Sequence, residues 1–320
     1  MTSSLSSLLT AAANYYVEQF HTIPESPASL YTRQRGITEI PITAYCLGYA
    51  PQNASNSVFR HLWQNYLESM IKYAGLCYHA NGTAHDFLQA RLIFPVFDEH
   101  SEVIGFIGRR LNDNSTEPKY LTTHETSLYK KSDVLYGFNF AKDYIQSEQF
   151  AIIVEGNLDV IALHQNHIMN AVATCGTAFS DTQLDKLTNL TQDFILLYDS
   201  DSAGVKGIVR FMQKALPLSL KVGLVELPEG EDPASFVLST SRYDLMKKIY
   251  QRINFIDFII NACKRQGLFN SPAEKSACIE TILDLISCIP NSKTFDYYIN
   301  TLGSKTGLST TSLRKQCKRK

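Results

Sequence analysis

Residues 151–159 read AIIVEGNLD, residues 194–204 read FILLYDSDSAG and residues 222–233 read VGLVELPEGEDP, and these three segments decide the fold. Each is an apolar run followed by acidic and turn residues. A short apolar run bounded by turn residues is typical of a strand buried on both faces of a parallel sheet. The acids then follow the carboxyl ends of strands, which is the edge where open α/β sheets bind ligands. The sequence therefore predicts a ligand site at this edge.

The acids in these segments suit a hard cation. Asp199 and Asp201 stand two residues apart, so in an extended segment their side chains project to the same side. Mg²⁺ prefers oxygen ligands and usually bridges to substrate phosphates. An aspartate pair together with Glu155 meets that requirement.

The three acidic segments together resemble the TOPRIM domain of DnaG-type bacterial primases. Glu155-Gly156, residues 199–204 and residues 230–233 follow one another in the family's order, about 30 to 45 residues apart, with helical patterns between them. One Asp-x-Asp pair is weak evidence because it occurs by chance in many chains, whereas three ordered clusters are strong evidence. The resemblance implies a TOPRIM lobe that binds Mg²⁺, with Mn²⁺ as the alternative ion.

Segments before residue 150 resemble the N-terminal part of the same primase family. They keep the family's order: Arg35-Gly36-Ile37, residues 45–51, residues 91–96, residues 105–109, Pro118-Lys119-Tyr120-Leu121, Lys131-Ser132 and Leu135-Tyr136-Gly137. The resemblance implies contacts to template and nucleotide from five basic residues: Arg35, Arg91, Arg109, Lys119 and Lys131. Tyr120 either stacks on a base or packs within the fold.

The resemblance also implies roles for the acids. Glu155, Asp199 and Asp201 are expected to be the catalytic core, and the expected metal ligands are Glu155, Asp159, Asp199, Asp201 and Asp232. Asp159 lies in the turn that opens a helix, so stabilisation by the helix dipole explains it equally well. A role as a solvated strand-end carboxylate or as a helix N-cap is the alternative for any single acid.

The chain is predicted to be α/β (α+β overall) with three lobes. These are a mixed, basic N-terminal lobe at residues 1–147, a central TOPRIM parallel-sheet lobe at residues 148–232 and a helical lobe at residues 233–320. Strands and helices alternate with short connections in the central lobe, which favours right-handed βαβ crossovers. Glycines at its strand-to-helix turns, Gly204 among them, are expected for backbone freedom rather than for contacts.

Apolar periodicity predicts the elements of the N-terminal lobe. An amphipathic helix is expected over residues 1–22 and a further helix over residues 59–74. Residues 91–96 and 103–110 are expected to form two strands joined by a turn.

The sequence departs from the family at several motif positions. Phe87 and Gln89 stand where the family has arginines, which implies a weaker hold on the template, and Ala234 replaces an acid, which puts a second metal position in doubt. Such losses predict a divergent member carried by a mobile element or phage. The primase motifs begin by Arg35 and the chain ends at Lys320, so neither a zinc-binding nor a helicase-binding domain is expected. A replicative helicase and a separate zinc-binding or initiation protein are then expected as partners.

Composition limits the class of protein. There are 30 basic and 31 acidic residues among 320, so a nucleic-acid binder must gather positive charge locally. The seven cysteines include no Cys-x-x-Cys pair, so no structural zinc is expected and free thiols fit a reducing compartment. No run approaches the ~18 apolar residues of a membrane span, and no signal peptide is recognised. We expect a cytoplasmic protein without a membrane partner.

The function implied by the resemblance is that of a DNA primase core, a nucleotidyltransferase with DNA-directed RNA polymerase activity. It would synthesise short RNA primers on single-stranded DNA from ribonucleoside triphosphates. One alternative is a catalytically weak replication accessory module that binds single-stranded DNA or a helicase. A TOPRIM nuclease is a further alternative, although the N-terminal segments match primases.

Overall fold

The computed structural model describes residues 4–23, 25–52, 57–112, 116–176, 178–199, 202–228 and 230–317. The chain folds into two compact units, and each unit receives two separate pieces of the chain. The first unit combines Met1–Lys142 with Gly156–Thr177, and the second combines Asp143–Glu155 with Ala178–Lys320. The division into three lobes stays a prediction.

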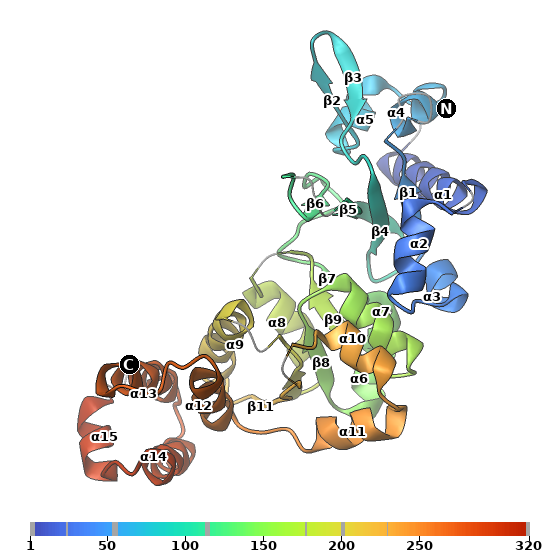
Figure 1. Cartoon of the computed structure of the whole chain (residues 1–320). Helices are drawn as coiled ribbons and strands as arrows, with labels where there is room; N and C mark the ends of the chain where they lie inside the picture. The colour runs from blue at the N-terminus through green and yellow to red at the C-terminus, as the bar shows by residue number, and fades with distance from the viewer. Residues whose placement is uncertain are drawn as a thin grey trace. The chain divides into compact units, whose positions relative to one another are not determined.

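An antiparallel sheet of order β1-β4-β5-β6 forms the centre of the first unit (Figure 1). Its strands are β1 (Gly48–Ala50), β4 (Arg91–Phe97), β5 (Val103–Arg110) and β6 (Tyr120–Thr122). The two strands predicted over residues 91–96 and 103–110 are confirmed as β4 and β5, which pair antiparallel. On the next strand, Tyr120 is the register partner of Arg109. The sheet therefore brings these two residues together.

Helix α1 (Leu5–Thr22) packs against β1 and β5 of this sheet (Figure 1). Leu8, Leu9, Ala12 and Tyr16 form its buried face and recur at helical spacing. The approach to β1 is close, because a Cβ atom at Gly48 would lie 2.5 Å from Cβ of Tyr16. The helix predicted near the N-terminus is thus confirmed over Leu5–Thr22.

The single helix predicted over residues 59–74 is wrong. Two short helices, α4 (Val58–Trp63) and α5 (Glu68–Tyr73), occupy this stretch, and a hairpin of β2 (Cys77–Ala80) and β3 (Thr83–Asp86) follows. The backbone at Leu67 is extended, with φ −65° and ψ 136°, which interrupts the helix. The apolar spacing carried no sign of this break, because both short helices are apolar on one side.

Five further elements belong to the first unit: α2 (Pro27–Gln34), α3 (Glu39–Ala44), β7 (Leu135–Tyr136), α7 (Asn157–Gln165) and β9 (Ala171–Thr174). His164 of α7 is buried and bonds at both ring nitrogens. The Ala171 carbonyl can only accept, so Nε2 of His164 donates to it at 3.0 Å and Nδ1 accepts from the Tyr45 hydroxyl at 2.6 Å. Burial lowers the pKa of His164 to about 4, so the ring is neutral.

Parallel strands form the sheet of the second unit. β10 (Asp193–Leu196) pairs parallel with both β8 (Ala151–Val154) and β11 (Lys221–Leu224). Helix α6 (Phe138–Glu148) precedes β8, while α8 (Asp181–Thr188) and α9 (Ser202–Ala215) lie before and after β10 in the sequence. β8 is entirely buried, as its continuous apolar run predicts. Because these strands are parallel, their carboxyl ends lie at one edge.

The remainder of the second unit is helical, as the sequence predicts. The helices are α10 (Pro233–Ser239), α11 (Arg242–Tyr250), α12 (Phe255–Arg265), α13 (Pro272–Ser287), α14 (Ser292–Thr306) and α15 (Thr310–Gln316). α12 packs on β11 and α13 packs on α9, and helices α12 to α15 gather together in Figure 1. Within the described residues, no helix combines the length and the hydropathy needed to cross a membrane.

Candidate active site

Glu155 and Asp199 meet at the carboxyl-terminal edge of the parallel strands. Glu155 directly follows β8, and Asp199 follows the end of β10 by three residues. The backbone N–H of Asp199 donates to Oε1 of Glu155 at 3.1 Å. We call this pair the acidic edge. Its two acids lie 44 positions apart in the sequence, and the parallel pairing of β8 with β10 brings them together.

Gly204, near the start of α9, makes this approach possible. A Cβ atom at position 204 would lie 2.0 Å from the Asp199 carbonyl oxygen and 2.9 Å from Oε1 of Glu155. We expected a glycine here because of its backbone freedom, and the structure corrects this expectation. The φ angle of Gly204 does not lie in the left-handed region, and a glycine is needed because there is no room for a Cβ atom. Any side chain at this position would displace the acidic edge.

Tyr198 adds a buried group beside the acidic edge. Its side chain is 7% exposed. Burial, and then the negative charge of Glu155, raise the pKa of the Tyr198 hydroxyl well above its ordinary value. The phenol therefore stays neutral and contributes no additional negative charge.

The other predicted metal ligands that the structure describes, Asp232 and Asp159, accept backbone hydrogen bonds at the starts of helices. Asp232 is the N-cap of α10, where Oδ1 accepts from the backbone N–H of Ser235 at 2.7 Å. Asp159 accepts from the backbone N–H of Gly156 at 3.0 Å and so completes the capping of α7. Asp201 lies outside the described residues. Among the residues that are described, no three His, Cys, Asp or Glu side chains form a group that could hold a metal.

A second group of predicted residues comes together in the first unit. The Arg109 guanidinium carbon lies 3.9 Å from the ring centroid of Tyr31, and Nε of Arg35 donates to the Tyr31 hydroxyl at 2.9 Å. Nζ of Lys119 lies 6.0 Å from the ring centroid of Tyr120. We call Arg35, Arg109 and Lys119, together with these two tyrosines, the cationic cluster.

The cationic cluster is held together by its aromatic rings. Arg109 is only 4% exposed and donates to the Arg110 carbonyl at 2.8 Å. Burial, and then the proximity of Tyr31, raise the pKa of Tyr120 to about 12. The positive charge of Arg109 and its hydrogen bond to Tyr120 lower this pKa, and the negative charge of Asp159 raises it. Asp159 therefore lies near the cluster, within the first unit. Cation–π contact of this kind orients a guanidinium without neutralising it.

Arg91 occupies a different environment from the other predicted basic residues. It is 1% exposed, and Nη1 donates to the carbonyl oxygens of Gly108, Pro118 and Lys119 at 3.2, 3.0 and 3.4 Å. Its other terminal nitrogen, Nη2, is 3.0 Å from the Glu117 carboxylate. Through these bonds Arg91 holds the main chain at Pro118 and Lys119 next to Gly108 of β5.

Lys131 is half-buried and lies near Cys175. Its backbone N–H donates to the Glu125 carboxylate at 2.9 Å. Burial raises the pKa of the Cys175 thiol to about 12, and the positive charge of Lys131 acts in the opposite direction.

Sequence reasoning missed Tyr31 and the spatial role of Gly204. Tyr31 stands four positions before Arg35 at the end of α2, and that spacing places two side chains on one helical face. The spacing was therefore a usable signal. The sequence did not mark Gly204 as a site of close approach, because its contact with the Asp199 carbonyl depends on the path of the backbone between them and Glu155 is distant in the sequence.

Models of three protein families match this chain. Residues 15–142 match "DNA primase catalytic core, N-terminal domain", residues 152–237 match "Toprim-like", and residues 256–311 match "DnaB-helicase binding domain of primase". The last match corrects the expectation that a helicase-binding domain is missing. Buried apolar stripes in this stretch predicted helices correctly but could not distinguish one class of helical domain from another.

Individual proteins give the same result. A DNA primase of Clostridium acetobutylicum is 32% identical over 306 residues, which are 95% of this chain and 50% of that protein. A DNA primase domain of Pseudomonas aeruginosa is 30% identical, with a TM-score of 0.80 over 98% of this chain and 99% of that one. A DnaG primase catalytic domain bound to single-stranded DNA is 28% identical, with a TM-score of 0.77 over 96% and 98% of the two chains. The chain thus spans about half the length of the curated relatives it matches.

Proposed function

Since the chain belongs to the DnaG-type DNA primase family, we propose that it is a primase catalytic core that synthesises short RNA primers on single-stranded DNA. The reaction joins a 3′-hydroxyl to the α-phosphorus of a ribonucleoside triphosphate and releases pyrophosphate. The observation that supports it most directly is the contact of Asp199 with Glu155 at the strand ends. Two acids from separate strands at one edge are the arrangement that this chemistry requires.

The acidic edge is suited to hold Mg²⁺. Its donors are carboxylate oxygens, which magnesium prefers, and Gly204 leaves space beside them. We assign Glu155, Asp199 and Asp201 as ligands, with Asp159 and Asp232 as outer contributors that also cap helices. When bound, the ion would neutralise phosphate charge and polarise the phosphoryl group. The fixed backbone bond from Asp199 to Glu155 orients the Glu155 carboxylate before the ion arrives.

The cationic cluster is proposed to bind the nucleotide and template phosphates. Lys119 is exposed and Arg35 is half-buried, so both can reach a phosphate, while Arg109 supplies a fixed charge next to Tyr31. Lys131 is assigned to the same function from its matched motif. Arg91, which is buried on main-chain carbonyls, is assigned a positioning role for Lys119 in place of direct contact.

The helical segment at residues 256–311 is proposed to contact a replicative helicase. Its match is to a helicase-binding domain of primases, and its helices carry exposed aromatic side chains such as Tyr297, which is 60% exposed. The expected partner is a DnaB-type helicase. A pull-down of the full chain with and without Tyr297→Ala tests this contact.

The central test is a primer-synthesis assay with purified full-length chain, single-stranded DNA, ribonucleoside triphosphates and Mg²⁺. Short oligoribonucleotides should form, and Asp199→Ala should abolish them. Asp185→Asn on α8, an exposed acid of the same unit, is the matched control and should leave synthesis near the parental rate. Absence of product on several templates, even with a helicase and a zinc-binding partner added, would overturn the proposal in favour of an accessory module.

A further inference from the structure

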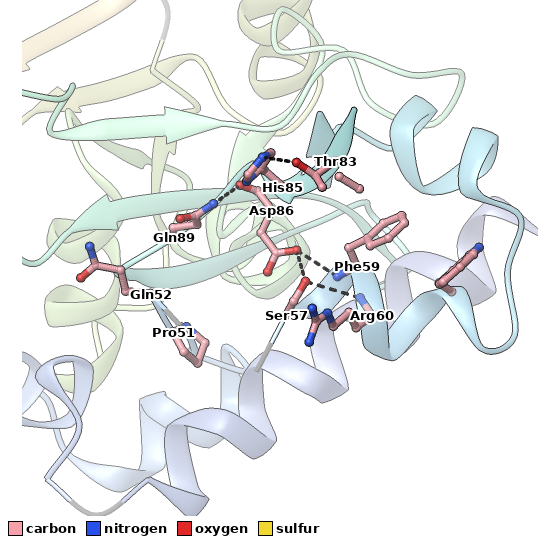
Figure 2. A pocket seen from close by; sticks show the side chains of 11 residues that line it. Pro51, Gln52, Ser57, Phe59, Arg60, Thr83, His85, Asp86 and Gln89 are labelled. Atoms are coloured by element: carbon pink, nitrogen blue, oxygen red, sulfur yellow. Dashed lines mark hydrogen bonds between the residues drawn. The ribbon is translucent and has the colours of Figure 1, made fainter. Parts of the chain in front are cut away.

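Asp86 in the first unit and Cys278 in the second are buried groups that the proposed chemistry does not use. Asp86 is 8% exposed, and its carboxylate accepts from the Ser57 hydroxyl at 2.7 Å and from the backbone N–H of Phe59 at 3.0 Å (Figure 2). These bonds hold the start of α4, so Asp86 has a structural role. Cys278 is 5% exposed and differs from Asp86, because its thiol hydrogen-bonds a second thiol, that of Cys263.

Cys263 lies on α12 and Cys278 on α13, and the connection between these helices is short and capped on both sides. Gly267 has a φ of +69°, and the backbone N–H of Leu268 donates to the Cys263 carbonyl at 2.8 Å, which closes α12. A capping box of Ser271 and Glu274 opens α13. The two helices pack on each other and lie side by side in Figure 1. We call α12, α13 and their connection the helical hairpin.

The Phe269 ring in this connection shows which residues of the two helices face each other. Nζ of Lys264 on α12 and Nζ of Lys275 on α13 each lie 5.7 Å from the centroid of the ring. Cys263 precedes Lys264 by one residue. Cys278 follows Lys275 by three residues, a spacing that stays on one helical face. The register of the helical hairpin therefore brings the two cysteines opposite each other, in agreement with their hydrogen bond.

The two thiols differ in their access to solvent. Cys263 is half-buried, whereas Cys278 is buried. Burial, and then the contact with Cys263, raise the pKa of the Cys278 thiol well above its ordinary value, so this thiol stays protonated. Oxidants react with thiolates that they can reach, so Cys263 is placed to react first and Cys278 to act as its resolving partner.

We propose that Cys263 and Cys278 are a modification site, which a peroxide oxidises to a reversible disulfide that braces the helical hairpin. Both thiols are free in the structure, which therefore represents the reduced state. The bond would close a loop of about 15 residues, a length for which a disulfide stabilises a fold appreciably.

The chemistry of the proposed site balances with hydrogen peroxide as the oxidant. The Cys263 sulfur attacks one peroxide oxygen, so that an S–O bond forms and the O–O bond breaks, and the departing hydroxide leaves as water with the thiol proton. The Cys278 sulfur then attacks the Cys263 sulfur, so that the S–S bond forms, the S–O bond breaks and a second water leaves. The two thiols lose two electrons, which reduce the peroxide. A dithiol reductant reverses the reaction.

The helical hairpin lies within residues 256–311, the segment that matches a helicase-binding domain. A disulfide between α12 and α13 would make the stability of this segment depend on the redox state. The inference goes beyond the proposed function and does not depend on it, since the bond would form whether or not the chain makes primers.

Peptide mass spectrometry of the full chain tests the bond directly. Treatment with a slight molar excess of hydrogen peroxide, followed by alkylation and digestion, should give two peptides joined through Cys263 and Cys278. Cys278→Ser should instead trap Cys263 as a sulfenic acid that dimedone labels. Cys288→Ser removes another half-buried thiol of the same unit and is the matched control, in which the joined peptides should persist. Alkylation of both thiols after peroxide treatment, or equal pairing of either thiol with other cysteines, would overturn the proposal.

Thermal melting tests whether the bond braces the fold. The peroxide-treated chain should melt about 5–10 °C above the chain kept in dithiothreitol, because the closed loop restricts the unfolded chain. Cys263→Ser should remove this difference while melting like the parental chain in dithiothreitol, and Cys288→Ser should retain it. Adding dithiothreitol to the oxidised parental chain should restore the lower melting temperature. Equal melting of the oxidised and reduced parental chains would refute the brace.

Discussion

In the acidic edge a backbone N–H orients a carboxylate, whereas in the cationic cluster an aromatic ring orients a guanidinium. Asp199 and Glu155 are placed by strand ends and by the space at Gly204, so main-chain geometry determines their separation. Arg109 is placed by the face of Tyr31, so side-chain packing determines its position. The difference teaches that the two groups of residues tolerate substitution differently: the position of the acids depends on the backbone, and the position of Arg109 depends on the neighbouring side chains.

The largest expected effect comes from removing a charge at the acidic edge. Glu155→Gln keeps the size of the side chain and an acceptor for the Asp199 N–H, but it removes the charge that would hold Mg²⁺. Primer synthesis should fall at least about 100-fold at saturating substrate. Glu148→Gln, seven positions earlier and exposed, is the control and should stay near the parental rate. A small loss in Glu155→Gln would show that this acid is not part of the metal site.

Gly204→Ala tests whether backbone geometry controls the acidic edge. The new Cβ would collide with the Asp199 carbonyl at 2.0 Å, so the edge must shift although no charge changes. We expect about a tenfold loss of primer synthesis and a stability cost of about 1–3 kcal/mol. On the same helix, Gly207→Ala meets only the Tyr198 ring at 3.0 Å and should cost less. Comparable activity of both variants would contradict the claim about space.

Two substitutions of Tyr31 test the other half of the comparison. Tyr31→Phe keeps the ring over Arg109 and loses the 2.9 Å bond from Arg35, while Tyr31→Leu loses both. Tyr31→Leu should raise KM for the nucleotide roughly fivefold, which corresponds to about 1 kcal/mol, with a smaller effect on kcat. Tyr31→Phe should recover most of that loss. If Phe and Leu behave alike, the ring does not position Arg109.

The smallest expected effect concerns the stability of the first unit as a function of pH. The pKa of His164 is about 4 in the folded chain and 6.5 in the unfolded chain, so below pH 6.5 the unfolded chain binds more protons. Stability is therefore lost as pH falls from 6.5 toward 4, by about 1 kcal/mol between pH 6.5 and 5.5. Urea titrations of the parental chain and His164→Gln should diverge by this amount. Parallel pH dependences would show that His164 does not titrate as inferred.

The parallel strands and the acids after them could be predicted from the sequence because both signals are local. An apolar run such as residues 151–154 and the acid that follows it are adjacent in the chain, and parallel pairing then brings separate strand ends together. Tyr31 and Arg109 illustrate the opposite case, since no short-range pattern links residues so far apart. The break between α4 and α5 was also unpredictable, because it depends on the extended backbone at Leu67 and not on apolar spacing.

Arg91 has a consequence for how freely the connection between β5 and β6 can change its length. One guanidinium grips the main chain at residues 108, 118 and 119, and so it pins both ends of that connection to the sheet. Insertions within residues 111–116 would then leave Lys119 where it is, since lengthening a loop costs little free energy once its ends are fixed. The connection is thus a place where this protein could accept foreign sequence, such as an affinity tag or a fluorescent label, without disturbing its chemistry.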